Sequence, residues 1–71
     1  MKIRYVYGFL KGVDVESNFV PLVGDYVSLN GCVGVPFYIQ ARTLKVVNRT
    51  YIYRDNSVTV YLMKDDSKVF T

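Results

Sequence analysis

Apolar and polar residues alternate along most of this 71-residue sequence, and each alternating run is short. Successive side chains of a strand point to opposite faces, so a period of two predicts strands with one apolar face. No segment carries the three-and-four spacing of apolar residues that an amphipathic helix needs. Turn-forming residues separate the runs at intervals of about eight to twelve residues, as in compact β proteins. The sequence therefore predicts an all-β chain.

The N-terminal run shows the alternation most clearly. Its apolar side chains recur at every second position: Ile3, Tyr5, Tyr7 and Phe9. This pattern predicts a strand that ends at Gly12. The polar stretch 14–18 is expected to form a loop or a single helical turn. Pro21 and Gly24 then bracket a change of direction before a short strand over 25–29, in which Val27 and Leu29 share a face.

The middle of the chain contains a turn signal and a long apolar stretch. Asn30-Gly31 is a strong turn dipeptide, and it begins a loop expected to run to Pro36. From Phe37 the pattern is that of a strand for about seventeen residues, which is longer than the usual 3–10, so we expect it to bend. Apolar residues shift from odd to even positions near 42–43, which predicts a β-bulge there. A second break is expected at 48–49.

A hairpin turn is expected at residues 54–57, and the length of its loop decides which face each tyrosine occupies. A two-residue loop at Asp55-Asn56 places Tyr51 and Tyr53 on the core side, and this is the interpretation we favour. A three-residue loop with a bulge instead gathers the same two tyrosines with Tyr61 on the outer face. The pattern alone leaves both loops open.

Five or six short strands in a chain of this length favour a barrel. We expect one domain, residues 1–71, folded as a small, strongly bent antiparallel barrel of five to six strands, SH3-like or OB-like, because closure leaves few open edges. The polar residues 64–68 precede a short closing strand or tail at 69–70. A core of this size only narrowly offsets conformational entropy, so self-association as a homodimer or higher oligomer is a further expectation.

The composition excludes several kinds of chemistry. With no His and one Cys, the usual zinc, haem and Cys–His sites cannot be built within one chain, and no internal disulfide can form. The six carboxylates have no base, oxyanion donor or nucleophile to complete a catalytic set. We therefore expect no enzyme activity, no cofactor and no metal, and we interpret Cys32 as a free thiol.

Targeting signals are also missing from the sequence. No stretch approaches the roughly 18 apolar residues of a membrane span, and charges and Gly interrupt the first twelve residues. We therefore expect a cytoplasmic protein without a membrane partner.

Three segments together follow the pattern of a known group of proteins. They are P-L-V-G-D-Y-V-S-L at 21–29, Y-I-Q-A-R at 38–42 and V-T-V-Y-L at 58–62. Over residues 21–62 the chain resembles small SH3-like single-barrel proteins of bacteriophages and mobile elements. The resemblance implies a size class and a bacterial host cell, but it carries over no functional residue. The loop at 31–36 and the long N-terminal strand depart from the pattern.

The segment 42–54 mixes basic and aromatic side chains and contains no acid. Nucleic-acid surfaces need this mixture, although Lys and Arg also protect strand edges. Seven tyrosines are many for 71 residues, and Tyr is both enriched at protein interfaces and a good strand former. Seven residues are therefore candidates for contact with a partner: Tyr38, Arg42, Lys45, Arg49, Tyr51, Tyr53 and Tyr61.

Three classes of function remain. We expect a non-catalytic binding module whose partner is a protein and, given the phage-like resemblance, a host protein that the module modulates. The first alternative is a nucleic-acid-binding β-barrel that uses residues 42–54. The second alternative is a small structural subunit of a self-assembling particle.

Overall fold

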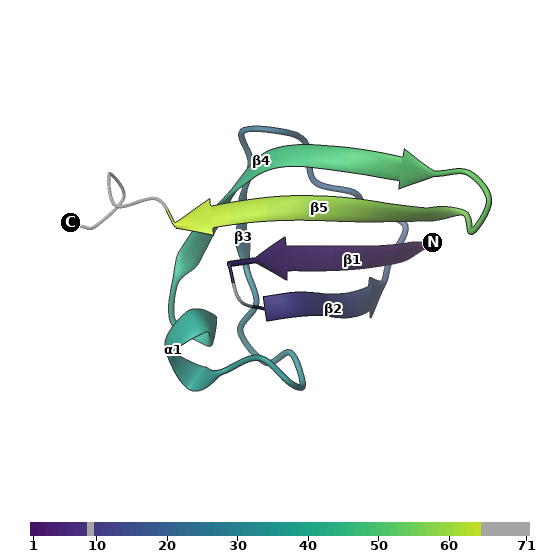
Figure 1. Ribbon diagram of the computed structural model, residues 1–71. Helices are drawn as coiled ribbons and strands as arrows, with labels where there is room; N and C mark the ends of the chain where they lie inside the picture. Colours follow the sequence, from purple (N-terminus) through teal and green to yellow (C-terminus); the bar gives the residue numbers. More distant parts are fainter. Residues whose placement is uncertain (9, 65–71) are drawn as a thin grey trace.

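The computed structural model, which describes residues 1–8 and 10–64, is a single five-stranded sheet curled into a half-barrel (Figure 1). In chain order its elements are β1 (Lys2–Tyr7), β2 (Leu10–Glu16), β3 (Tyr26–Ser28), α1 (Phe37–Gln40), β4 (Thr43–Ile52) and β5 (Ser57–Lys64). The strands follow the order β2-β1-β5-β4-β3 across the sheet. The all-β, barrel-like prediction is confirmed. The segments expected at 65–68 and 69–70 lie outside the described residues.

The sheet is mixed, so the expectation of a wholly antiparallel arrangement is wrong at one strand pair. β1 pairs antiparallel with β2 on one side and parallel with β5 on the other. The pairs β3–β4 and β4–β5 are antiparallel. A period-two pattern shows which face of a strand is apolar but is the same for both strand directions, so the sequence pattern could not reveal the parallel pair.

The first strand ends at Tyr7 and the chain turns at Gly8, whereas the sequence pattern predicted a strand as far as Gly12. Gly8 has φ +53°, a conformation that glycine adopts without steric cost. β2 follows at once, so the stretch expected to be a loop or helical turn from residue 14 is strand as far as Glu16. Val13 is buried and Val15 is half-buried, while the acidic residues between and after them are exposed. Because this alternation covers only two apolar residues, the sequence pattern did not predict a strand here.

The core fills the concave, inner face of the sheet. β1, β2, β4 and β5 supply most of it, and the loop before α1 and α1 itself supply the remainder. The buried apolar residues are Ile3, Tyr5, Val13, Leu29, Val35, Ile39, Leu44, Val46, Val58, Val60 and Leu62. Ile3 and Tyr5, which the sequence pattern placed on the apolar face of the first strand, are confirmed as core residues.

Residues 37–40 form the single helical turn α1 and not the start of a long strand. Pro36 precedes the turn with φ −58°, close to the value that a proline ring imposes near helix N-termini. Ile39, which the sequence pattern placed on the apolar face of a strand, is buried in the core as part of the helical turn. No helix in residues 1–8 and 10–64 is both long enough and apolar enough to cross a membrane.

The irregularity of β4 lies between Val46 and Asn48. The bulge expected at 42–43 is therefore absent from that position, and the break expected at 48–49 is close to the observed one. The bulge reverses which positions face inward. Leu44 and Val46 face inward before it, whereas Arg49 and Tyr51 lie opposite inward-facing residues of β5 after it.

The segment from Pro21 to Asp25 forms a tight turn, which confirms the predicted change of direction. The Asp25 N–H donates to the Leu22 carbonyl at 3.0 Å, and the Asp25 carboxylate accepts the Leu22 N–H at 2.8 Å. Gly24 has φ +100°, as the third residue of a type II turn requires. Its N–H donates to the Val46 carbonyl at 2.8 Å. The Val-Gly-Asp sequence therefore serves the fold and joins this turn to β4.

Candidate functional site

The β4–β5 hairpin closes through a four-residue loop, residues 53–56, because Ile52 lies opposite Ser57. The Asp55 N–H donates to the Ile52 carbonyl at 3.2 Å, and Asn56 adopts a left-handed conformation with φ 52°. Both loop lengths considered from the sequence are therefore too short. Asn is one of the few residues other than glycine that adopt this conformation readily.

The loop length places Tyr51 on the inner face of the sheet. A four-residue loop and a two-residue loop differ by an even number, so both put Tyr51 on the same face. Tyr51 lies opposite Val58, which is fully buried. Tyr51 nevertheless remains 46% exposed, because α1 covers the opposite end of the half-barrel (Figure 1). The face predicted for the favoured loop is correct, but Tyr51 is not a core residue.

Three residues of the hairpin contact one another in series. The guanidinium carbon of Arg49 lies 6.0 Å from the centre of the Tyr51 ring, within range of a cation–π interaction. The rings of Tyr51 and Tyr53 are stacked with their centres 6.3 Å apart and their planes at 17°. Tyr53 lies in the loop and is 91% exposed. We call Arg49, Tyr51 and Tyr53 the Arg–Tyr ladder.

The base of the Arg–Tyr ladder is fixed to another part of the chain. The Arg49 Nη1 donates a hydrogen bond to the carbonyl of Pro21 at 3.1 Å. Pro21 is buried and Arg49 is half-buried. The Arg49 N–H also donates to the side-chain oxygen of Asn48 at 2.8 Å. Because the guanidinium is already held, a partner that binds here would not bear the entropic cost of ordering it.

Exposed apolar residues flank the point where Arg49 is attached. Phe19 precedes Pro21 by two residues and is 78% exposed, and Leu22 and Val23 follow it and are also exposed. Neighbouring exposed apolar side chains are typical of protein-contact surfaces. The Arg–Tyr ladder and these three residues together form the candidate contact surface.

The structure separates the other residues predicted to contact a partner. Lys45 and Tyr61 belong to the outer face, since their neighbours in sequence, Leu44 and Leu62, are buried on the inner face. Tyr38 lies on α1, and Arg42 lies in the turn between α1 and β4; both are exposed. The basic and aromatic segment 42–54 is therefore not one continuous surface.

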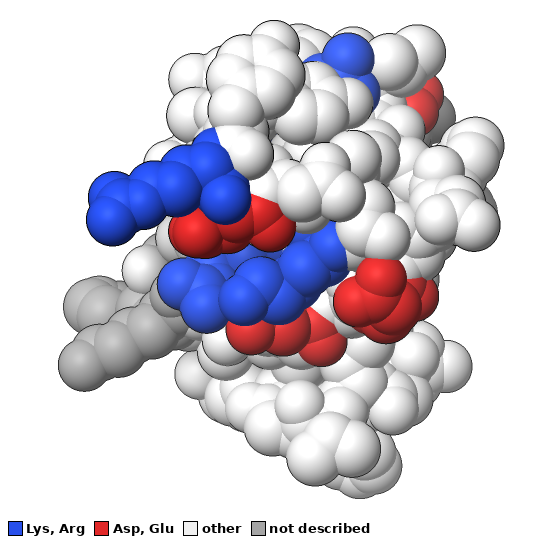
Figure 2. All heavy atoms as spheres, turned by 90° about the vertical axis from the view of Figure 1, so that its right-hand side faces the viewer, with Lys and Arg blue, Asp and Glu red and all other residues white. Residues whose placement is uncertain are grey.

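Basic and acidic side chains are interleaved at the end of the molecule that carries the hairpin. Figure 2 shows this end, where blue and red groups alternate and do not form one positive area. Arg4 of β1 and the N-terminal amine of Met1 form ion pairs with β2: Arg4 Nε lies 2.9 Å from Asp14 Oδ1, and the Met1 amine lies 2.7 Å from Glu16 Oε2. The hydrogen bond from Arg4 lowers the pKa of Asp14.

The described part of the chain was compared with the needs of a metal site. Within residues 1–8 and 10–64, no three His, Cys, Asp or Glu side chains come together as metal ligands would. Cys32 is a half-buried free thiol. Burial, and in smaller part the neighbouring Cys32, raises the pKa of Tyr5, which stabilises the neutral phenol within the core.

The apolar residues beside Pro21 were not predicted from the sequence as part of a surface. They belong to the run Phe19-Val20-Pro21-Leu22-Val23, in which apolar residues do not alternate with polar ones. When consecutive residues around a turn are all apolar, they cannot all point into the core. That property was the available signal that some of these side chains are exposed.

No family model, no curated protein and no solved structure matches this chain. The resemblance to small phage barrels therefore stays a prediction. The fold and the candidate site define a class in physical terms: a small all-β, barrel-like protein with an exposed aromatic surface at one end of its sheet.

Proposed function

We propose that this protein is a non-catalytic binding module that contacts a protein partner through the Arg–Tyr ladder and the neighbouring Phe19, Leu22 and Val23. The observation that carries the proposal is the geometry of the ladder. Its tip, Tyr53, is almost fully exposed, whereas its base is fixed by the hydrogen bond from Arg49 to Pro21.

The types of residue in the ladder support a protein interface. Tyr and Arg are enriched among the few residues that dominate binding energy in protein complexes. Tyrosine offers a large contact area with few rotatable bonds, so its immobilisation costs little entropy. The stacking of Tyr51 on Tyr53 and the contact of Arg49 with Tyr51 restrict these side chains before any partner arrives.

The distribution of charge favours a protein partner over nucleic acid. Nucleic-acid affinity comes largely from several cations that contact phosphates together. The ladder contains one cation, Arg49, and part of its hydrogen-bonding capacity is already used by Pro21. The exposed Arg54 follows Tyr53 in the loop, where Asp55 comes next in the sequence. Lys45 belongs to the outer face and Arg42 lies at the α1 end of β4, so neither extends a positive track from the ladder.

The predicted phage-like origin suggests where to look for the partner. A small phage barrel acts inside a bacterial cell, so the proposed partner is a bacterial host protein that this module modulates. A tagged chain is therefore incubated with nuclease-treated bacterial lysate, and the retained proteins are compared between variants.

The decisive comparison uses the double variant Tyr51→Ser/Tyr53→Ser and the control Tyr38→Ser, which removes an exposed tyrosine on α1, at the other end of the molecule. One protein should be retained by the natural sequence and by the control and lost by the double variant. With the purified partner, the double variant should bind at least about 30-fold more weakly, as the loss of a dominant contact implies.

Other results would replace this proposal. Retention of the partner by the double variant would show that the ladder is not the interface. If a parallel lysate without nuclease yields nucleic acid alone, and a charge reversal at Arg42, Lys45 and Arg49 abolishes this retention, the protein is a nucleic-acid binder. If the purified chain sediments as a discrete large oligomer with no captured protein, it is a structural subunit.

A further inference from the structure

The outer edge of β4 is unpaired along the half of the strand that carries the base of the Arg–Tyr ladder. β3 pairs with β4 only as far as Lys45, and the Gly24 N–H extends the contact to the Val46 carbonyl. From Asn48 to Ile52, β5 is the only strand that pairs with β4 in the described chain. This part of β4 forms the border of the sheet (Figure 1). A further strand therefore has room to pair along it.

The backbone groups of Arg49 and Tyr51 face this free edge. The Arg49 N–H donates to the side-chain oxygen of Asn48 at 2.8 Å, which directs it away from β5. The N–H and C=O groups of alternate residues in an antiparallel pair point to the same side, so those of Tyr51 point the same way as those of Arg49. Within residues 1–8 and 10–64, the Tyr51 N–H and carbonyl have no hydrogen-bond partner on that side. Tyr51 thus offers one donor and one acceptor to an incoming strand.

The sequence of this edge permits the addition of a strand. Natural edges are commonly protected by Lys, by Pro, by a bulge or by an inward-pointing charge. The stretch Asn48–Ile52 contains no Lys and no Pro, and the bulge of β4 lies before it. Its one charged side chain, Arg49, is already held by Tyr51 and by the Pro21 carbonyl. The usual obstacles to strand pairing are therefore missing from these described residues.

Apolar side chains border the free edge on both faces and at one end. Tyr51 on the inner face is 46% exposed, and Ile52, which faces the opposite way, is 38% exposed. The turn that carries the exposed Leu22 and Val23 lies where the edge begins, because its Gly24 N–H bonds to β4. A strand that pairs here would cover part of this apolar surface, since directly opposite residues share a face.

We propose that the partner binds by adding an extended segment of its own chain to the free edge of β4 at Asn48–Ile52. The inference rests on the proposed function, because it specifies how a protein partner engages the surface that contains the Arg–Tyr ladder. The backbone of the segment exchanges hydrogen bonds with Tyr51, and every second side chain lies on the inner face beside the Tyr51 ring. The segment is as long as the free edge, and its side chains on the inner face are apolar.

Charge favours a segment of another protein over a second copy of this chain. Two copies paired in opposite directions through Asn48–Ile52 would bring Arg49 of one copy near Arg49 or Arg54 of the other. The chain has a formal net charge of +3, and like charges placed across a strand pair are destabilising. A segment without a cation on its inner face avoids this repulsion.

The test uses a synthetic peptide as the probe: acetyl-V-T-F-T-V-amide, in which apolar residues alternate with threonine. It is titrated into the isotope-labelled full chain and followed by two-dimensional NMR. The amides from Arg49 to Ile52 should shift and saturate. In the free protein the Tyr51 amide should exchange quickly with solvent, and the peptide should slow this exchange because it accepts a hydrogen bond from the Tyr51 N–H.

A backbone variant separates the edge from the side chains. Chemical ligation at the Gly31–Cys32 junction joins two synthetic segments and allows one N-methyl group on Tyr51, whose side chain is kept. Because this N–H points out of the sheet, the methylated chain should stay folded but bind the peptide about tenfold more weakly. The matched control is N-methylation of Thr50, which should destabilise the fold because the N–H of this alternate residue points to β5.

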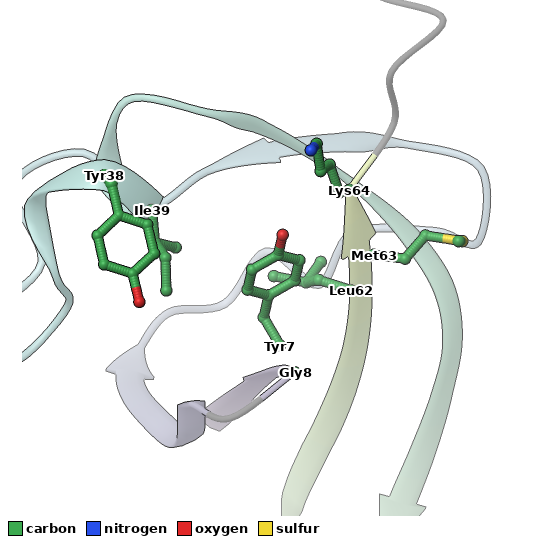
Figure 3. Close-up of a pocket in the computed structure, with 7 residues that line it drawn as sticks. All are labelled: Tyr7, Gly8, Tyr38, Ile39, Leu62, Met63 and Lys64. Atoms are coloured by element: carbon green, nitrogen blue, oxygen red, sulfur yellow. The ribbon is translucent and has the colours of Figure 1, made fainter.

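Several results would overturn the proposal. Shifts that never saturate would do so, as would shifts centred on Ile39 and Leu62, which line an open pocket of about 440 Å³ at the α1 end of the half-barrel (Figure 3). Unfolding of the chain methylated at Tyr51, or slow exchange of its amide in the free protein, would place this N–H in the β5 ladder. Concentration-dependent shifts of the same amides without peptide would assign the edge to a second copy.

Failure of strand addition can be told apart from failure of the proposed interface by repeating the lysate capture with the methylated chain. If the double variant Tyr51→Ser/Tyr53→Ser loses the partner and the chain methylated at Tyr51 retains it, the Arg–Tyr ladder is the interface and strand addition is wrong. If the methylated chain loses the partner and the double variant retains it, the edge of β4 is the interface and the ladder is not.

Discussion

Tyr51 and Val58 lie directly opposite each other on β4 and β5 and share the inner face of the sheet, yet Val58 is fully buried and Tyr51 is about half exposed. Val58 has a second neighbour, Ile3 of β1, on its other side. At Tyr51 no further strand borders β4 in the described chain, because β3 pairs with β4 only as far as Lys45. Position in the sheet, and not polarity, makes one residue core and the other surface.

This difference predicts that two substitutions lower stability by different amounts. The double variant Tyr51→Ser/Tyr53→Ser should lower the free energy of unfolding by no more than about 1 kcal/mol, because Tyr53 is almost fully exposed and Tyr51 is about half exposed. Val58→Ala should lower it by about 2 kcal/mol through lost burial and the cavity left behind. Urea unfolding followed by circular dichroism measures both. A double variant as unstable as Val58→Ala would place the tyrosines in the core.

Gln40 is predicted to hold the loop before α1 in place. Its side-chain oxygen accepts the Gly31 N–H at 3.0 Å, and its Nε2 donates to the Val35 carbonyl at 2.8 Å. Gln40→Ala should cost about 1–3 kcal/mol in the free energy of unfolding, since the part-buried Val35 carbonyl loses its partner.

Gln40→Glu is the informative comparison for this loop. A glutamate can still accept the Gly31 N–H but cannot donate to Val35 when ionised, so it should recover only part of the loss. Amide hydrogen exchange at 31–35 should accelerate in both variants. Unchanged exchange in Gln40→Ala would show that other contacts hold the loop.

Gly12 is predicted to be required for the path of the Arg4 side chain across the sheet. A Cβ at Gly12 would lie 2.9 Å from the Arg4 Cδ, and the glycine has φ +154°. Gly12→Ala should therefore displace Arg4 from Asp14 and lower stability by about 1–2 kcal/mol through backbone strain.

A double-mutant cycle with Arg4→Ala separates the two effects at Gly12. The steric part should vanish once Arg4 is truncated, whereas the backbone strain should persist. If Gly12→Ala costs the same in both backgrounds, the side chain of Arg4 is not constrained by this glycine.

The pair formed by Arg4 and Asp14 predicts a dependence of stability on acid pH. The hydrogen bond from Arg4 holds the pKa of Asp14 below its ordinary value of 3.8. The pair should therefore stabilise the fold fully above this pH, and the contribution should be lost as the pH falls through the lowered pKa. Urea unfolding of the natural sequence and of Asp14→Asn should differ more at pH 7 than at pH 2. A constant difference would contradict this assignment.

The sequence pattern predicted which strand faces are apolar better than it predicted how the strands connect. The alternation at Ile3 and Tyr5 correctly identified core residues. It did not reveal the turn at Gly8, because the residues on both sides of that turn continue the apolar character of β1. Residues 37–40 also have a strand-like pattern, but they form a helical turn from which Ile39 enters the core.

The candidate site was predictable in its residue types but not in its grouping. Arg49, Tyr51 and Tyr53 were among the expected contact residues and lie together. Lys45 and Tyr61 were also expected, but the bulge between Val46 and Asn48 determines which β4 residues share a face with them. A bulge that is missed changes the face of every later side chain, and one that is misplaced changes the faces of the residues between the two positions.

The parallel pair at the centre of the sheet also affects how the chain folds. Lys2 lies opposite Ser57, and the pairing continues to Tyr7 and Leu62, so the middle of the sheet forms only when distant parts of the chain meet. Such contacts close a long loop and slow folding. During synthesis, β1 emerges long before β5, and its inner edge has no partner until nearly all of the described chain has left the ribosome. The nascent protein thus depends on its last described strand to protect its first.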